Sequence, residues 1–342
     1  MMSSGDHSLE DFLLEERKKH SHATGELNGL IFSIARACKI IAKNIAMGER
    51  LETMRGEVRA SQQTQEIIVE TLLNSGRIDG IIFSDLSEPL FSDQGAQTGK
   101  YLVLVGALEG SNDLEINASA GTVFSIVRKG EREQVTTDTF CRSSSEQICA
   151  GYVIYGPVTM LVITVGDGTH GFTLDPSIGE FVFTHPNLSV VENTNNFAIN
   201  SANSRFWSPA IKRYVDECIA GDSGSRGREF SMRWIDSLIS ETHRILLRGG
   251  VFMNPMDGET SRSGQAKLHY HANPIAMLIE QAGGAASNGN CRITDIESKG
   301  IDQQIGFIFG SKEEIIRIEE YHQETAEKYD APLFGDRGLF RD

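Results

Sequence analysis

The sequence predicts a layered α/β protein in which helices pack on both sides of the sheets. Three observations support this class. Apolar residues recur at helical spacing from Leu27 to Ile45, near the start of the chain. Short β-branched and aromatic runs, separated by Gly, Pro and Asp turns, fill residues 150–184. Helical and strand patterns then alternate to the end of the chain, which favours layers over a barrel.

Length and charge limit the function classes. The chain has 342 residues, of which 39% are hydrophobic, so it can bury a large core in two lobes. Acidic residues outnumber basic ones by 47 to 32, giving a formal charge of −15, which argues against nucleic-acid and anionic-membrane partners. No apolar run approaches the roughly 18 residues of a membrane span. The five dispersed cysteines indicate reduced thiols and a cytoplasmic location.

Composition divides the chain into three segments. Residues 1–22 are polar and charged, and we expect a mobile or interface arm there. Residues 23–190 form the predicted N-terminal lobe. Residues 191–335 form the predicted C-terminal lobe, which begins after an asparagine- and serine-rich shift in composition near residue 190.

In the N-terminal lobe, Thr24 is the expected N-cap of the helix that contains Leu27 and Ile45. The polar stretch 56–65 is expected to be a loop, followed by a helix over 64–73. Strands are expected over 80–83, 101–105, 122–127 and several segments of 150–184.

In the C-terminal lobe, Ser208 followed by Pro209 predicts a helix start. We expect a long helix over 231–248, strands over 251–253 and 266–270, and a helix over 274–281. Ser311 and Glu314 have the spacing of a capping box, which predicts the start of the final helix.

The strand over 101–105 is expected to end at Gly106, and a polar loop with Glu109, Gly110, Ser111 and Asn112 follows it. A glycine-rich loop after a strand can present backbone N–H groups and carboxylates to a phosphate or a metal. The same pattern also fits an ordinary tight connection.

Other candidate groups also have two interpretations. The Asp85 and Glu109 carboxylates could bind a hard cation or be solvated loop acids. Arg233 and Arg244 could bind phosphate or form salt bridges. Two histidines, His269 and His271, would face the same side of a strand and could bind a metal or serve the structure. The sequence contains no Gly-x-Ser-x-Gly, His-Glu-x-x-His or Walker motif.

Several longer motifs resemble the class I fructose-1,6-bisphosphatase family, over residues 9–333. The matching stretches are ATGEL (23–27), GKY (99–101), AGYVIYG (150–156), HGFTLDPS (170–177), FAIN (197–200), MRW (232–234), HRIL (243–246), GGVF (249–252), ANP (272–274) and EQAGG (280–284).

This resemblance implies a five-layer α-β-α-β-α fold, a sugar-phosphate pocket at the lobe junction, and usually a homotetramer. It also implies Mg²⁺-dependent removal of the 1-phosphate of fructose 1,6-bisphosphate, with metal ions activating water and stabilising the leaving oxygen. The positions that match the family's substrate-binding residues are Gly110, Ser111, Asn112, Asn200, Arg233 from a neighbouring subunit, Asn254 in place of a tyrosine, and Gln265 in place of a lysine.

The chain departs from the family where metal ligands are expected. The family's Asp-Pro-Leu-Asp loop reads Gly106-Ala-Leu-Glu109, its Glu-Glu pair reads Asp85-Leu86, and a distal glutamate is His271. A further acid of the family is missing near Ser61, so no residue is assigned a catalytic role. The remaining candidate metal ligands, Asp85, Glu109 and His271, suit Mn²⁺, Fe²⁺ or Zn²⁺ better than Mg²⁺, and the alternative is that no metal binds.

Together these features predict a family member with lost or strongly reduced Mg²⁺-dependent phosphatase activity. It would bind a sugar phosphate, such as fructose 1,6-bisphosphate, or act as a regulatory subunit, as a homotetramer or in a hetero-oligomer with an active homologue. The first alternative is an active, divergent sugar phosphatase with a changed metal preference, and the second is an assembly protein without a ligand. Partial matches to the family's nucleotide site at 24–27 and 100–101 leave that site open.

Overall fold

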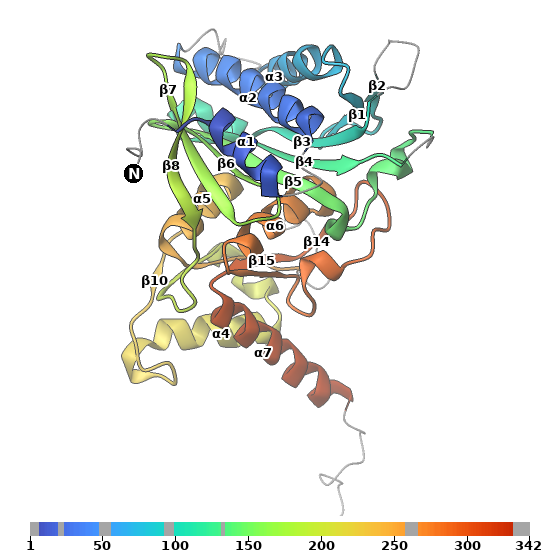
Figure 1. The fold of residues 1–342 in the computed structure, drawn as a ribbon. Helices are drawn as coiled ribbons and strands as arrows, with labels where there is room; N and C mark the ends of the chain where they lie inside the picture. The colour runs from blue at the N-terminus through green and yellow to red at the C-terminus, as the bar shows by residue number, and fades with distance from the viewer. Residues whose placement is uncertain are drawn as a thin grey trace, which may run out of the picture.

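The computed structural model describes residues 7–19, 24–47, 56–91, 99–130, 134–256 and 266–330. Two sheets and three helical layers alternate as α-β-α-β-α (Figure 1), as the sequence predicted. The outer layer on the N-terminal side contains α1 (Leu9–Lys19), α2 (Gly25–Ala46) and α3 (Gly56–Leu73). The central layer contains α5 (Leu238–Arg248) and α6 (Asn273–Gln281), and the other outer layer contains α4 (Pro209–Ala220) and α7 (Lys312–Asp330).

The larger sheet has eight strands in the order β2-β1-β3-β4-β5-β6-β7-β8. Strands β1 and β3 are parallel, and the other neighbouring pairs are antiparallel. The strands are β1 (Ile78–Phe83), β2 (Leu90–Phe91), β3 (Tyr101–Glu109), β4 (Ala120–Arg128), β5 (Gln147–Tyr155), β6 (Thr159–Thr164), β7 (Thr169–Asp175) and β8 (Glu180–Leu188).

The smaller sheet has five strands in the order β10-β9-β11-β15-β13, with β9 parallel to both of its neighbours. A separate two-stranded ribbon pairs β12 with β14. These strands are β9 (Asn196–Ile199), β10 (Ser231–Met232), β11 (Val251–Asn254), β12 (Ala266–Lys267), β13 (Ala285–Ser287), β14 (Gln304–Ile305) and β15 (Phe307–Gly310). The short helices are η1 (Ser111–Ile116), η2 (Thr137–Phe140), η3 (Ser144–Glu146), η4 (Ser201–Phe206), η5 (Gly221–Ser223), η6 (Leu268–Ala272) and η7 (Ile293–Asp295).

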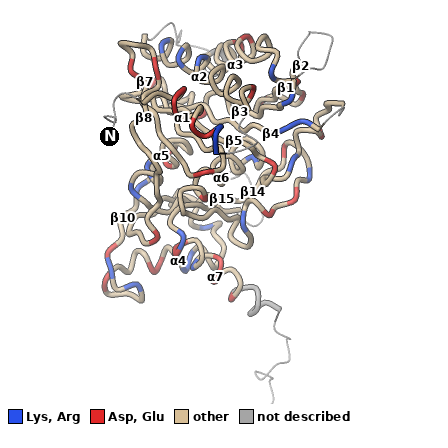
Figure 2. Tube along the Cα trace, in the orientation of Figure 1, with Lys and Arg blue, Asp and Glu red and all other residues tan. Residues whose placement is uncertain are grey.

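Strand alternation builds the core on both faces of the larger sheet. In β5, Val153 and Tyr155 join the cluster under α1–α3, whereas Tyr152 and Ile154 join the cluster around α5 and α6. Because successive side chains point to opposite faces, a strand covered on both sides is apolar along its whole length. Charged residues accordingly gather on the outer helices and loops (Figure 2).

The N-terminal segment differs from the expected arm. Residues 9–19 form α1, and Leu9, Phe12 and Leu13 are buried in the larger core cluster. The i, i+3, i+4 spacing of these three residues gives the helix one apolar face. Packing of that face, which also contacts β8, overrides the polar composition of the rest of the segment.

Two helix starts also differ from the sequence predictions. Helix α3 begins at Gly56, so the expected loop over 56–65 is helical. Helix α5 begins at Leu238, capped by Ser237, because Ser231 and Met232 pair with β9 as an edge strand instead. The helices after Thr24 and Ser208 begin as predicted, with each hydroxyl accepting a backbone N–H bond.

The cysteines and the search for membrane-spanning helices complete the description of the fold. All five cysteines are free thiols, and Cys38, Cys149 and Cys218 are buried. Within the described ranges, no helix combines the length and apolarity needed to cross a membrane.

Candidate site at the junction of the two sheets

The glycine loop begins later than the sequence suggested. Strand β3 continues past Gly106 to Glu109, because pairing with β4 resumes at Glu109 and Gly121. The register shifts between Gly106 and Glu109, so this end of the strand is bulged. Gly110 then turns the chain into η1 with a φ of 78°, a conformation that glycine adopts without strain.

The Glu109 side chain folds back over Gly106. An ideal Cβ on Gly106 would lie 2.6 Å from Glu109 Oε1 and 2.7 Å from Val123 Cγ1. Both separations are too short for a real side chain, so a residue larger than glycine requires Glu109 and Val123 to move. Positions 106 and 109 are therefore structurally coupled.

Glu109 forms an ion pair with His271 across the junction. His271 Nε2 lies 2.9 Å from Glu109 Oε1, and the two side chains are 15% and 25% exposed. Burial would raise the pKa of the Glu109 carboxyl, but His271 outweighs it, with a smaller contribution from Lys267, so that the pKa lies below its ordinary value. The carboxylate is thus held ionised by protein groups.

The two histidines flanking Tyr270 do not share a face. The strand expected over 266–270 ends at Lys267, and Leu268–Ala272 forms the single π-helical turn η6. His271 faces Glu109, whereas His269 is buried and its Nε2 lies 2.8 Å from Ser298 Oγ. Burial lowers the pKa of His269 to about 4, which keeps it neutral. A π-turn rotates successive side chains unlike a strand, and such turns are frequent at functional sites.

Asp85 follows β1 and binds residues of α3. Gln65 Nε2 donates to both Asp85 carboxylate oxygens at 2.6 Å, and Ser61 Oγ lies 3.4 Å from Oδ2. Leu86 packs against the larger core cluster and offers no ligand atom. Ser61 and Asp85 therefore lie together.

The three predicted metal ligands are only partly gathered. Glu109 and His271 contact each other, whereas Asp85 accepts its hydrogen bonds from Gln65 and Ser61. Across the part of the chain that the structure describes, no three His, Cys, Asp or Glu side chains cluster closely enough to hold a metal ion.

Two of the predicted sugar-phosphate residues occupy adjacent strand ends. Strands β9 and β11 are parallel with Ile199 opposite Met253, which places Asn200 beside Asn254. Asn200 Oδ1 accepts a bond from Ala202 N at 3.1 Å and caps η4. Its Nδ2 has no hydrogen-bond partner among the described residues, so this amide can donate to a ligand.

The other predicted binding residues are more dispersed. Arg233 is exposed after β10, and its backbone N donates to Phe197 O. Ser111 Oγ lies 3.4 Å from Asn112 Oδ1 at the start of η1. Gln265 lies outside the described residues. Arg244, the other arginine considered for phosphate, forms an ion pair with Glu241 at 2.8 Å.

Sequence reasoning missed two residues of this site. Gln65 donates to both carboxylate oxygens of Asp85, and it lies where the expected loop over 56–65 and the expected helix over 64–73 overlap. Lys267 helps to keep Glu109 ionised and lies 3.1 Å from Asp302. Lys267 lies two residues after Gln265, which matches the family's substrate-binding lysine. This closeness in sequence could have indicated Lys267 as a residue of the site.

Comparisons with known proteins agree with this fold. Sequence models of the N-terminal and C-terminal domains of fructose-1,6-bisphosphatase match residues 7–186 and 190–323. The structure is similar to fructose-1,6-bisphosphatase of Leishmania major in its holo form, with a TM-score of 0.83 and 28% identity over 92% of this chain and 98% of that chain. The T-state of the same protein gives a TM-score of 0.82 at 28% identity, covering 93% and 98%. The fold is thus the layered α/β sugar-phosphatase fold.

Curated relatives give the more particular assignment. A class 1 fructose-1,6-bisphosphatase of Methylibium petroleiphilum is 46% identical, over 99% of both chains. The class 1 fructose-1,6-bisphosphatase of Hydrogenophilus thermoluteolus is 44% identical, over 98% of this chain and 97% of the relative. The chain belongs to the class I fructose-1,6-bisphosphatase family.

Proposed function

We propose that this family member binds a sugar phosphate in carbohydrate metabolism and has lost, or strongly reduced, the Mg²⁺-dependent phosphatase reaction. One observation carries the proposal: the Glu109 carboxylate fills the space beside Gly106 and is ion-paired with His271 at 2.9 Å. This carboxylate is therefore already engaged by a protein imidazole.

The donor set does not fit Mg²⁺. This ion requires near-octahedral oxygen coordination, supplied by carboxylates, water and substrate phosphate. Here Gly106 and Leu86 supply no oxygen, and His271 supplies a nitrogen. Asp85 accepts bonds from Gln65 on both oxygens. Because several ligands are missing together, the transition state would lose several kcal/mol of stabilisation. Each 1.36 kcal/mol lost slows the reaction about tenfold.

The ligand part of the proposal rests on residues that remain. Asn200 and Asn254 lie together at the ends of β9 and β11, and Asn200 Nδ2 is available to donate. The family's use of a neighbouring subunit's arginine makes Arg233, which is exposed, a candidate phosphate ligand across a subunit interface. The proposal therefore includes a homotetramer, or a hetero-oligomer with an active homologue, in the cytoplasm.

A phosphate-release assay tests the lost reaction. Purified protein is incubated with fructose 1,6-bisphosphate and Mg²⁺ or Mn²⁺, beside a variant carrying Gly106→Asp, Glu109→Asp, Leu86→Glu and His271→Glu. Glu109 is shortened in this variant because its carboxylate occupies the space that a side chain at 106 needs. We expect turnover only in the variant. Turnover by the natural chain at ordinary enzyme rates with Mg²⁺ would contradict the proposal.

A separate binding measurement tests the ligand. Calorimetry with fructose 1,6-bisphosphate and no metal should show saturable binding that Asn200→Ala weakens about tenfold, since a charged hydrogen bond contributes about 1.5 kcal/mol. Asn290→Ala, at an exposed position away from the junction, is the matched control. Absence of binding would favour an assembly protein without a ligand.

The contact between Glu109 and His271 also favours a second candidate function. A carboxylate and an imidazole within 2.9 Å could turn toward one Mn²⁺, Fe²⁺ or Zn²⁺ ion, as in an active phosphatase with a changed metal preference. A screen of these metals with a panel of sugar phosphates tests this alternative. Neither turnover nor metal binding would occur if the first proposal is right.

A further inference from the structure

A polar cavity of about 410 Å³ lies where β9 begins and α5 ends, at the opposite end of β9 from Asn200. Its wall includes the asparagine-rich segment 193–196, which leads into β9, together with Arg228 and Arg248. Two guanidinium groups and several amides thus face one space. We propose that this cavity binds a small dianionic metabolite of the phosphate monoester class.

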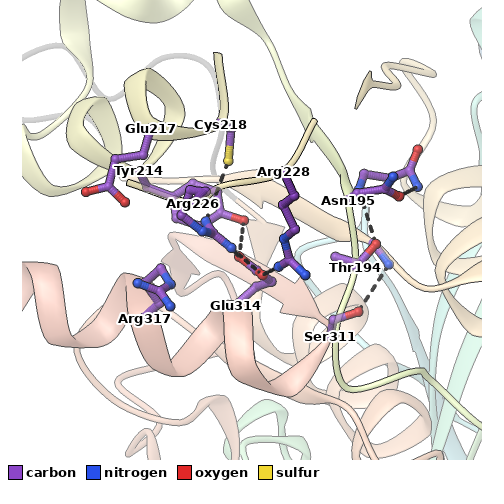
Figure 3. Close-up of polar contacts among 12 residues, drawn as sticks. Thr194, Asn195, Tyr214, Glu217, Cys218, Arg226, Arg228, Ser311, Glu314 and Arg317 are labelled. Carbon is purple, nitrogen blue, oxygen red and sulfur yellow. Dashed lines mark hydrogen bonds and ion pairs between the residues drawn. The ribbon is translucent and has the colours of Figure 1, made fainter. Parts of the chain in front are cut away.

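The first arginine is fixed from behind by a buried carboxylate. Glu314, in the first turn of α7, is 1% exposed and lies between Arg226 and Arg228 (Figure 3). Arg226 Nη2 donates to both Glu314 oxygens at 2.6 and 2.7 Å, and Arg228 Nη2 donates to Oε1 at 2.6 Å. Tyr214 donates to Oε2 at 2.8 Å, so each Glu314 carboxylate oxygen accepts two hydrogen bonds.

This arrangement leaves a surplus of positive charge. Two guanidinium groups share one carboxylate, and the side chain of Arg228 is 35% exposed on the cavity side. Its Nε and Nη1 have no hydrogen-bond partner among the described residues. An arginine that is pre-oriented by an ion pair loses less conformational entropy when it binds an anion.

The second arginine, Arg248, ends α5 and is exposed, and none of the described residues forms an ion pair or hydrogen bond with its side chain. In a chain with a formal charge of −15, a cation facing a cavity without a carboxylate partner is unexpected. The wall also holds one acid, Glu229, whose Oε1 accepts a bond from Asp222 N at 3.4 Å and lies beside Gly221. Among the described residues, no ion pair joins Glu229 to either arginine.

The amide wall is also ordered. Asn195 O accepts a bond from Ser231 N at 2.8 Å, and Thr194 Oγ1 accepts one from Asn196 N at 3.2 Å. Asn196 donates its side-chain amide to Asn195 Oδ1, which leaves the Asn195 Nδ2 group as a donor toward the cavity. Guanidinium groups and amide donors are the groups that recognise phosphate oxygens.

A simpler explanation competes for Arg248. A cation at a helix C-terminus is stabilised by the unpaired carbonyl groups there, without any ligand. That role predicts that replacing Arg248 changes stability and leaves anion binding unchanged. The same carbonyl groups repel an anion, so if a dianion binds in the cavity, Arg248 is required for binding.

The test is calorimetric titration of the full chain with inorganic phosphate and with ribose 5-phosphate, compared with ribose and citrate. We expect a saturable site for the phosphates, separate from the junction site, that Arg248→Gln weakens about tenfold and Arg248→Glu abolishes. Arg228→Lys, which keeps the charge beside Glu314, should weaken it less than Arg248→Glu.

Two controls separate this site from other sources of binding. Arg128→Gln removes an exposed arginine at the end of β4 and should leave the affinity unchanged. Asn200→Ala affects the junction site and should also leave it unchanged. The proposal is overturned if no saturable phosphate binding occurs at millimolar concentrations, if citrate binds more tightly than phosphates, if binding survives Arg248→Glu, or if Arg128→Gln or Asn200→Ala weakens it equally.

Discussion

Two carboxylates, Glu109 and Glu314, are each held by basic side chains, but in opposite ways. Glu109 is 25% exposed and has one close partner, His271 at 2.9 Å. Glu314 is 1% exposed and accepts four bonds, from Arg226, Arg228 and Tyr214. In the first pair one carboxylate meets one imidazole, whereas in the second one carboxylate is shared by two guanidinium groups, one of which lines a cavity. Partner number and burial therefore distinguish the two proposals: a metal site that is lost and an anion site that is formed.

The largest expected effect comes from the buried cluster. Glu314→Gln leaves two guanidinium groups without their anion, one of them 4% exposed. Removing one member of a buried ion pair costs about 3–5 kcal/mol. The measurement is the free energy of unfolding in urea, with Glu320→Gln, an exposed residue of the same helix, as the matched control. A loss below about 1 kcal/mol would show that the cluster is no stronger than a surface pair.

His243 of α5, in the central helical layer, gives a prediction for the pH dependence of stability. Burial, with a smaller contribution from His185, lowers the pKa of His243 to about 4 from the ordinary 6.5. The folded state then favours the neutral ring, so this contribution to stability is complete above pH 6.5 and is lost as the pH falls toward 4. His243→Gln should reduce the slope of unfolding free energy against pH in this window by about 1.4 kcal/mol per pH unit.

The same series of measurements has a clear negative outcome. If the His243→Gln variant and the natural chain have parallel pH profiles between these values, His243 titrates normally and the layer is open to water. The hydrogen bond between His243 Nδ1 and Tyr152, at 2.9 Å, would then contribute little to the neutral form.

The coupling between positions 106 and 109 predicts a smaller effect. Gly106→Asp places a side chain 2.6 Å from Glu109 Oε1, and overpacking of this kind costs about 1–3 kcal/mol. Adding Glu109→Ala should recover part of that loss, since the obstructing carboxylate is gone. Thermal unfolding of the two single variants and the double variant measures the coupling. Strict additivity would mean that Glu109 does not occupy the space beside Gly106.

The smallest effect is expected for the partly exposed pair of Glu109 and His271 itself. Glu109→Gln should cost about 1 kcal/mol or less at neutral pH, because solvent screens the ion pair. Since the pKa of Glu109 is lowered, its contribution is present above pH 4.5 and is lost as the pH falls below it. The natural chain and the variant should therefore converge in unfolding free energy in acid. A constant difference at all pH values would assign the effect to packing.

Local sequence signals predicted much of the fold. Thr24 and Ser208 cap the helices expected after them, because an N-cap hydroxyl acts within three residues. The final helix also begins after Ser311, but its capping box does not form. Ser311 Oγ accepts from Gly250 N, and the Glu314 carboxylate binds Arg226 and Arg228 instead. Distant partners outcompeted the local bond.

By itself, the sequence determined the layered class and the family, since these depend on periodicity and on residue identity. Only the tertiary structure decided which of the candidate site residues meet. The bulge in β3 brings Glu109 over Gly106, and the π-turn at Leu268–Ala272 brings His271 to Glu109 across 162 residues of chain. The structure likewise joined Arg228 to Glu314 across 86 residues. Such contacts depend on how layers pack, and no local pattern encodes them.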